Sequence, residues 1–475
     1  MATAVAATTV AFAFGPAASA GAAVLRLSTD PYTNPASQHK TEVEPDTFSS
    51  GSTVVSAFQV GRYFSGGANN IGFASSTNGG STWTNGFLPA TTPDSTPAGT
   101  TYARTSDPAV AFDAKHGVWL ISFLGLFPNG NTSQVDVLVS RSTDGGLTWG
   151  NPVVVNNDGD FNDKNWTTCD NHRSSPFYGH CYTEFDDNTL GDRIEMSTST
   201  DGGLTWGSQL ETADSRHGIG GQPVVQPSGR VIVPINGFAG QNFTVISFTS
   251  DDGGASWSKT HIVARVAFHH AAGGIRDSIP LPTADVDSSG KVFVMWQDCH
   301  FEPGCPASDI VLSTSTDGVK WSKLGRIPLD AVGSGVDHFF PGLAVRGKKL
   351  ALTYNYYPNA NCTTATCQLN VGYAASTDGG NSWSASTQLA GPMSLNWLPN
   401  TSQGFMVGDY LSTSFAGTRA YPAFALANAP TGTTLDEAIY TIQGGLGTGS
   451  AARTVSDHVD ASGSVTLTSS NITDQ

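Results

Sequence analysis

The sequence predicts an all-β protein: a single β-propeller made of four-stranded antiparallel blades. An eight-residue turn motif recurs six times, once in a shortened form, and short apolar runs with strand character precede each copy. Glycine is also abundant, with 54 of 475 residues. No long segment combines the helix formers Leu, Glu, Lys and Ala, so helices are not expected. We predict seven blades, with six as the alternative if the last unit is only a partial blade or a tail.

The turn motif has the pattern Ser-x-Asp-x-Gly-x-x-Trp and returns at intervals of about 60 residues, as expected for a repeat protein. A chance match is expected on the order of 0.01 times in a chain of this length. The copies are Ser76–Trp83, Ser142–Trp149, Ser199–Trp206, Ser250–Trp257, Ser376–Trp383 and, one residue shorter, Ser315–Trp321.

Each residue type in the motif suits a tight hairpin turn. Asp-Gly and Gly-Gly supply the positive φ angles of such a turn. The short Asp side chain accepts hydrogen bonds from backbone amides of its own turn, and the Trp covers the hairpin with a large apolar face. We therefore interpret the motif as structural and assign it no catalytic role.

Two strand-like runs precede each copy of the motif. The shorter first runs are Glu44–Phe48, Asp107–Phe112, Lys164–Cys169, Gln222–Gln226, Ala284–Val286 and Phe340–Val345. The second runs are Thr53–Val60, Val118–Leu124, His180–Phe185, Val231–Ile235, Val292–Trp296 and Leu350–Tyr356. A seventh unit without the motif follows, with Gly408–Phe415, Arg419–Leu426 and Ala438–Gln443. Each unit is thus four antiparallel strands with the motif between the third and fourth, and a closed ring of such units leaves few exposed sheet edges.

The termini and cysteines indicate export. Residues 1–20 are predicted to be a signal peptide, because an apolar stretch is followed by Ala18-Ser19-Ala20, although a positively charged start is missing. We assign residues 21–43 to an N-terminal extension and 44–475 to the propeller. The six cysteines permit 15 connectivities, and their clustering favours local pairing. The expected disulfides are Cys169–Cys181, Cys299–Cys305 and Cys362–Cys367, which imply a secreted or periplasmic protein.

The net charge of −16 argues against some partners. Such a surface repels nucleic acids and anionic membranes at long range, and no apolar run is long enough to span a bilayer. We expect a monomer without a cofactor. The segment Asp158–Asp163 alternates acidic and amide residues as a calcium loop does, but its central Gly and terminal Glu are absent, so a polar turn is favoured over structural calcium.

A ligand site is expected at one end of the propeller axis. Propellers bind ligands where the outer strand of one blade leads into the inner strand of the next. Charged residues make up only 13% of the chain, yet they recur at these junctions, where Glu44 and Asp163 also lie. The candidate binding residues are Arg62, Arg104, Lys164, Arg276, Asp298, His338, Tyr356 and Asp409. The disulfides Cys299–Cys305 and Cys362–Cys367 would staple loops on this face, either to pre-organise a site or only for stability.

The octet resembles the Asp box, or bacterial neuraminidase repeat, and the chain is similar to the sialidase superfamily from about Glu44 to Gln443. The stretch His217–Pro234 also resembles a sialidase inner blade. This resemblance implies a glycan ligand and a glycoside hydrolase that holds an anionic sugar through three arginines, here Arg62, Arg104 and Arg276. It further implies a tyrosine nucleophile activated by a glutamate, and an aspartate as acid/base. The matching positions are Tyr410, Glu184 and Asp107.

The family's Phe/Tyr-Arg-Ile/Leu-Pro motif is absent, and only Arg62 in VGRYF replaces it. A related glycan-cleaving activity, hydrolase or lyase, is therefore favoured over sialic acid cleavage. The alternative is a non-catalytic propeller that binds a glycan or a protein. An enzyme predicts an open pocket with at least two arginines and a carboxyl of raised pKa, whereas a binding module predicts aromatic and amide groups with its carboxyls paired in salt bridges.

Overall fold

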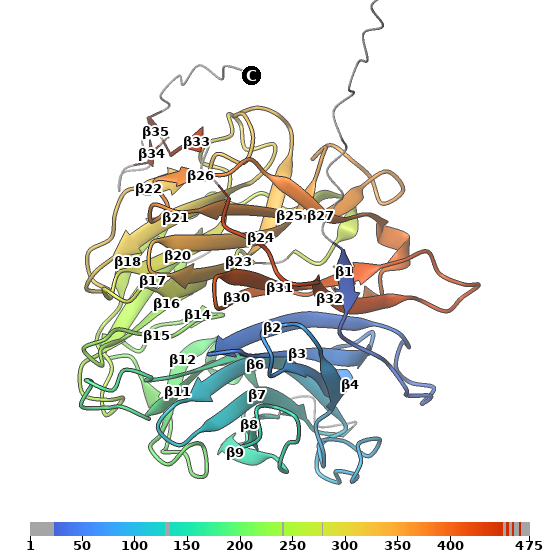
Figure 1. The fold of residues 1–475 in the computed structure, drawn as a ribbon, viewed down its shortest axis with the longest axis vertical. Helices are drawn as coiled ribbons and strands as arrows, with labels where there is room; N and C mark the ends of the chain where they lie inside the picture. Colours follow the sequence, from blue (N-terminus) through green and yellow to red (C-terminus); the bar gives the residue numbers. More distant parts are fainter. Residues whose placement is uncertain are drawn as a thin grey trace, which may run out of the picture.

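The computed structural model describes residues 23–128, 134–239, 242–277, 279–449, 453–455, 458–459 and 465–466. The predicted signal peptide at residues 1–20 lies outside the described residues. Antiparallel strands dominate the described chain, and its helical parts are three single turns (Figure 1). These turns are η1 (Asn188–Leu190), η2 (Ala272–Gly274) and η3 (Leu395–Trp397). The prediction of an all-β fold is confirmed. No helix of the described residues is both long and apolar enough to cross a membrane.

The first half of the chain forms three sheets. One sheet holds eight strands: β2 (Glu42–Ser50), β3 (Thr53–Arg62), β4 (Ala68–Ser76), β5 (Thr84–Phe87), β6 (Arg104–Asp113), β7 (Val118–Leu126), β8 (Val135–Ser142) and β9 (Val153–Asn156). The next contains β10 (Asn162–Cys169), β11 (Cys181–Asp187), β12 (Arg193–Ser199) and β13 (Leu210–Glu211). The third contains β14 (Gly218–Ile219), β15 (Val224–Val225), β16 (Val231–Ala239), β17 (Asn242–Ser250) and β18 (His261–Arg265).

The second half continues the pattern. One sheet contains β19 (Thr283–Val286), β20 (Val292–Asp298), β21 (Asp309–Ser315), β22 (Leu324–Arg326), β34 (His458–Val459) and β35 (Val465–Thr466). Another contains β23 (Asp337–Arg346), β24 (Lys349–Tyr357), β25 (Gln368–Ser376) and β27 (Thr387–Ser394). The last contains β30 (Ser412–Ala416), β31 (Arg419–Ala427), β32 (Glu437–Ile442) and β1 (Val24–Arg26). Two small pairs are β26 (Ser382–Trp383) with β33 (Arg453–Thr454) and β28 (Asn400–Thr401) with β29 (Gly404–Phe405).

The first strand of each set of strands packs beside the first strand of a neighbouring set. The strands β2, β6 and β10 follow one another in this way, and β23 packs against β30. The strand β30 in turn packs against β2, and Figure 1 shows β23, β30 and β2 one above another near the middle of the molecule. The β2–β5 and β6–β9 sets count as one sheet because a single residue pair, Ala68 with Thr105, joins them.

The N-terminal extension contributes a strand to the last sheet. Val24 to Arg26 form β1, which pairs antiparallel with β32 near the other end of the chain, as Figure 1 shows in blue and red. The seventh unit of the sequence supplies only three strands, and β1 completes the sheet.

The Asp-box turns have the predicted geometry. In the copy that joins β8 to β9, the Ser142 hydroxyl donates to Asp144 Oδ1 at 2.8 Å and accepts from the Gly146 amide at 3.0 Å. The same carboxylate oxygen accepts from the amides of Leu147 at 3.1 Å and Thr148 at 3.0 Å. The motif therefore serves to build the turn.

The motif also joins neighbouring sets of strands, which the sequence did not predict. Its second glycine lies against the preceding set so closely that a Cβ on Gly146 would lie 2.7 Å from Val55. Its tryptophan packs in the same direction: the Trp149 ring lies 5.8 Å from the Phe73 ring. The core of the molecule is thus the packed layers between successive sheets.

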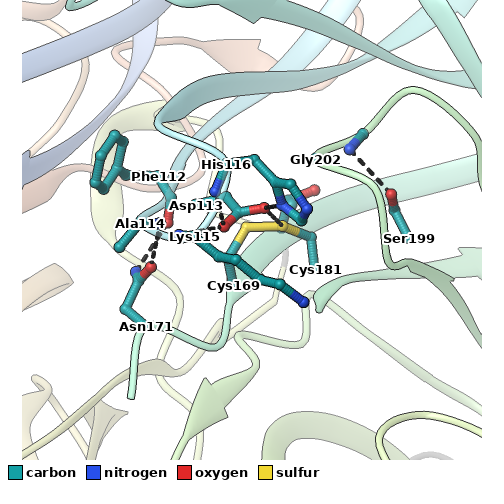
Figure 2. Close-up of a disulfide and its surroundings, with 12 residues drawn as sticks. Phe112, Asp113, Ala114, Lys115, His116, Cys169, Asn171, Cys181, Ser199 and Gly202 are labelled. Atoms are coloured by element: carbon teal, nitrogen blue, oxygen red, sulfur yellow. Dashed lines mark hydrogen bonds and ion pairs between the residues drawn. A yellow bond between two sulfur atoms is a disulfide. The ribbon is translucent and has the colours of Figure 1, made fainter. Parts of the chain in front are cut away.

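The three predicted disulfides are confirmed. Cys169 and Cys181 are directly opposite each other on β10 and β11. Figure 2 shows that the loop after Cys169 is hydrogen-bonded to the neighbouring β6–β7 turn. The Asn171 side chain donates to the Phe112 carbonyl at 2.8 Å and accepts from the Ala114 amide at 2.7 Å. Cys299–Cys305 and Cys362–Cys367 close loops between second and third strands, as predicted.

Candidate functional site

A repeated kink in the first strands brings charged side chains together. The strands β2, β6, β10 and β23 each contain a bulge whose first residue has a left-handed backbone. These residues are Glu44 (φ 53°), Asp107 (φ 48°), Lys164 (φ 48°) and Phe340 (φ 50°). A non-glycine residue in this region is uncommon and costs conformational energy, so it is often associated with function. Three of the four side chains meet in one charged cluster.

Lys164 is the centre of this cluster. Its Nζ lies 2.5 Å from Asp409 Oδ2, 3.0 Å from Asp107 Oδ2 and 3.5 Å from Glu44 Oε1. Burial acts to lower the pKa of Lys164, but Asp107, Asp409 and Glu44 outweigh it and hold that pKa well above the ordinary value. The ammonium group is therefore charged.

Two further cations surround the cluster. Arg276 donates to Asp409 Oδ2 at 2.6 Å. Arg62 donates to Gln59 Oε1 at 2.7 Å, and the Gln59 amide in turn donates to Glu44 and, at 3.2 Å, to Ser106. The Arg62 and Arg276 Nε atoms are buried without a hydrogen-bond partner.

The carboxyls of the cluster differ in charge state. Burial acts to raise the pKa values of Asp409 and Asp107, but the neighbouring cations outweigh it and both pKa values lie below the ordinary value. Burial and the charge of Asp107 raise the pKa of Glu44 to about 8. Burial and Asp107 likewise raise the pKa of Asp163 to about 6. At pH 7 the cluster combines ionised and protonated carboxyls, which is the pairing that acid/base chemistry uses.

An open cleft lies over the cluster. Arg62, Arg104 and Arg276 all line it, together with Asp107, Asp163 and Lys164. Arg104 donates to the Ser65 hydroxyl and the Gly66 carbonyl, both at 2.9 Å, and lies over the Tyr63 ring. The structure thus brings the three predicted arginines to one cleft. A smaller pocket adjoins it, lined by Asp163, Lys164, Arg276, Phe340 and Asp409 among others.

Tyr410 and Glu184 lie below and beside the cluster. The Tyr410 hydroxyl donates to the Pro108 carbonyl at 3.0 Å, and the residue lines a small cavity under Lys164 rather than the cleft. The Glu184 carboxylate accepts from the Gly221 amide at 3.0 Å. Within the described part of the chain, no hydrogen bond joins Tyr410 to Glu184.

Three predicted binding residues lie outside both the cleft and the adjoining pocket. Asp298 is buried and holds His300 at 2.6 Å. Tyr356 stacks on the buried His338, and the ring centroids are 6.2 Å apart. His338 also lies within 4.8 Å of Asp309 and Asp330, but Arg326 already binds both carboxylates, so this group is a structural ion cluster.

Four residues of the cluster had no assigned role in the sequence. Glu44 and Asp163 lie at the predicted junctions, whereas no pattern in the sequence marks Gln59 or Ser106 as site residues. Glu44 and Asp107 both precede a proline at the start of their units, and this shared position was the available clue.

The family comparison matches residues 126–425 to the BNR repeat-like domain. No curated protein sequence matches the chain. Among solved structures, a polysaccharide lyase described as an ulvan lyase, bound to -[GlcA(1-4)Rha3S]-, superposes with a TM-score of 0.52 at 11% identity, covering 90% of this chain and 97% of its own. A protein of unknown function from Dyadobacter fermentans has a TM-score of 0.47 at 15% identity, covering 75% of this chain and 99% of its own. The Trypanosoma rangeli sialidase in complex with sialic acid gives 0.43 at 13% identity, covering 76% and 59%.

Proposed function

This chain belongs to the BNR repeat-like domain family, and on that premise we propose that it is a secreted enzyme that cleaves glycans bearing acidic sugars. The observation that carries the proposal is the cleft lined by Arg62, Arg104 and Arg276. Planar guanidinium groups bind carboxylates with both charge and orientation.

Two of these arginines, the buried Arg62 and the partly exposed Arg104, differ from Arg276 in their partners. Among the described residues, neither Arg62 nor Arg104 forms an ion pair; their partners are an amide, a hydroxyl and a carbonyl. In a chain with a net charge of −16, arginines without acidic partners in one cleft favour an anionic ligand. The cleft also holds a partly exposed carboxyl, Asp163, whose raised pKa suits proton transfer.

The geometry supports a division of roles that differs from the one the resemblance implies. An acid catalyst must carry a proton, and Asp107 is held ionised by Lys164. A nucleophile must face the substrate, and the Tyr410 hydroxyl is turned to Pro108. We therefore propose that Asp107, Lys164 and Asp409 form the charged floor of the site and that bond cleavage takes place in the cleft over them.

We also infer that the repeated sets of strands are the seven blades of a closed propeller. The support is the packing of β30 on β2 and the channel at the far end of the molecule. That channel is lined by segments of β2, β6, β10, β15, β19, β23 and β30, one first strand from each set.

The test is a cleavage screen against sialosides, uronate-containing polysaccharides such as -[GlcA(1-4)Rha3S]-, and neutral glycans. We expect cleavage of an acidic glycan and none of the neutral ones. Arg104→Gln and Arg62→Gln should each lower kcat/KM by about 10-fold to 100-fold, since each removes a charged hydrogen bond to the ligand. Arg173→Gln, at an exposed site outside the cleft, is the control. Cleavage that is unaffected by either cleft variant would contradict the proposal.

A non-catalytic glycan-binding protein is the second candidate, favoured by the neutralisation of Lys164 and Arg276 within the floor. It predicts binding of the same acidic glycans, weakened by Arg104→Gln, without any cleavage product. Among cleaving enzymes, a lyase leaves an unsaturated, ultraviolet-absorbing product and a hydrolase does not.

A further inference from the structure

Asp163 differs from the other carboxyls of the candidate site. It lies near the start of β10, is partly exposed, and lines both the cleft and the adjoining pocket. Asp107 and Asp409 also line these hollows, but Lys164 binds both of them. Asp163 is thus placed where a substrate held by the arginines could reach it.

Asp163 also has no cationic partner. Within the described ranges no ion pair reaches its carboxyl, and its hydrogen bond is to the amide of the next residue, Lys164, at 2.9 Å. Glu44, the other carboxyl of raised pKa in the cluster, is buried and accepts from Gln59 and from the Asp409 amide. Of these two carboxyls of raised pKa, Asp163 is the one that is partly exposed and lines the cleft, where it can exchange a proton with a ligand.

The neighbouring strand also places an acidic residue beside Asp163. Asp186 is its direct neighbour across the β10–β11 ladder and is fully buried. Neither of its carboxyl oxygens has a hydrogen-bond partner among the residues that the structure describes. Burial, together with the charges of Asp163 and Glu184, holds the pKa of Asp186 well above its ordinary value, so this neighbour is neutral. It supplies no positive charge that would strip the proton from Asp163.

Resting on the proposed function, we propose that Asp163 is the catalytic acid of the cleft. Its proton passes to the glycosidic oxygen while the bond from that oxygen to the anomeric carbon breaks and leaves its electron pair on the oxygen. Water then adds its oxygen to the anomeric carbon and releases a proton, which returns Asp163 to its acid form. The net reaction consumes one water for each bond cleaved.

The pH dependence follows from the state of this carboxyl. Burial and the nearby charge of Asp107 raise the pKa of Asp163 to about 6. An acid catalyst works in its protonated form, so kcat/KM should fall as pH rises through about 6. The variant Asp163→Asn has no such proton, and this fall should disappear.

The experiment compares two substrates on the full-length protein. The first is an acidic oligosaccharide that the wild type cleaves, whose sugar leaving group needs protonation. The second carries the same acidic sugar on nitrophenol, which leaves without protonation. We expect Asp163→Asn to lower kcat on the oligosaccharide by about 10²-fold to 10⁴-fold and on the nitrophenyl glycoside by less than 10-fold. Asp160→Asn, on the preceding turn, is the matched control and should leave both rates unchanged.

A structural role for Asp163 would instead lower both rates equally, and this result would overturn the proposal. So would an Asp163→Asn variant that cleaves the oligosaccharide at the wild-type rate. A wild type that cleaves none of the acidic glycans would contradict the proposed function itself and remove the catalytic role of Asp163 with it. Failure of the catalytic role and failure of the proposed function can be told apart, because the first two results require a wild type that cleaves an acidic glycan.

Discussion

Lys164 carries a positive charge with only 8% of its side chain exposed, between Asp409, Asp107 and Glu44. A buried charge removed from such a group leaves its partners uncompensated, and this is strongly destabilising. The buried lysine therefore contributes more to the stability of the site than a surface ion pair would. It keeps the carboxylates of Asp107 and Asp409 ionised at the candidate site.

Replacing this lysine should be costly. We expect Lys164→Met to lower the free energy of unfolding at pH 7 by about 3–5 kcal/mol, since Asp107 and Asp409 lose their main counter-charge. The loss should shrink toward pH 5, because the two carboxyls can then take up protons. Urea unfolding at both pH values measures it, with Lys348→Met at an exposed site as control. An equal loss at both pH values would show that packing, not charge, is responsible.

Tyr410 offers a second test at this scale. Its hydroxyl donates to the Pro108 carbonyl and faces away from the cleft. We expect Tyr410→Phe to cost about 0.5–1.5 kcal/mol of stability through the lost hydrogen bond and to keep most of the turnover. Steady-state kinetics measures the turnover of this variant, and thermal unfolding of the same sample measures its stability. Loss of turnover in a stable variant would restore Tyr410 as the nucleophile.

At the scale of elements, the two glycines of the Asp-box turn have different structural roles. Gly79 (φ 67°) has open space where a Cβ would stand, whereas a Cβ on Gly80 (φ 76°) would lie 2.2 Å from the Tyr421 ring. Both positions have the same backbone strain for a side chain, but only Gly80 touches the neighbouring set of strands. The turn closes its own hairpin and also locks two sheets together.

This difference gives a matched pair of variants. We expect Gly80→Ala to be about 1–3 kcal/mol less stable than Gly79→Ala, because it adds a clash with Tyr421 to the shared strain. Chemical denaturation of the two variants measures the difference. Equal stabilities would mean that the Tyr421 ring moves aside without loss.

The sequence predicted these elements well where the signal is local. The octet Ser142–Trp149 contains every group of its own turn, so its hairpin could be predicted. The contact of Gly80 with Tyr421 could not, because it joins residues far apart in the chain. The same limit applies to the site. Its arginines were predicted from their junctions, but the pairing of Lys164 with Asp409 depends on how distant units pack against one another.

At the scale of the whole molecule, buried carboxyls should make the protein more stable in mild acid. Burial raises the pKa values of six of them: Glu42 and Glu44 to about 8, Asp285 and Asp309 to about 7, and Asp46 and Asp277 to about 6. Each holds a proton in the folded protein that the unfolded chain releases near pH 4. The folded state thus binds more protons over this range, and stability falls as pH rises.

We expect the free energy of unfolding to decrease from pH 5 to pH 8, by about 1.4 kcal/mol per pH unit for each extra proton held. Urea denaturation at constant ionic strength measures the slope. Asp285→Asn removes one of these groups and should flatten the slope between pH 5 and 7. Stability that rises over this interval would show that these carboxyls are ionised in the folded protein.

The sheet that β1 completes has a topological consequence. Three residue pairs, Val24 with Ile442, Leu25 with Thr441 and Arg26 with Tyr440, join this early strand to the late one. Peeling that short strand away leaves β32 as the exposed edge of the sheet, so hydrogen exchange should begin there. The same proximity means that a short linker could splice Val24 to the chain beyond Ile442, and new ends could be cut at an exposed loop elsewhere, giving a circular permutant with the same architecture.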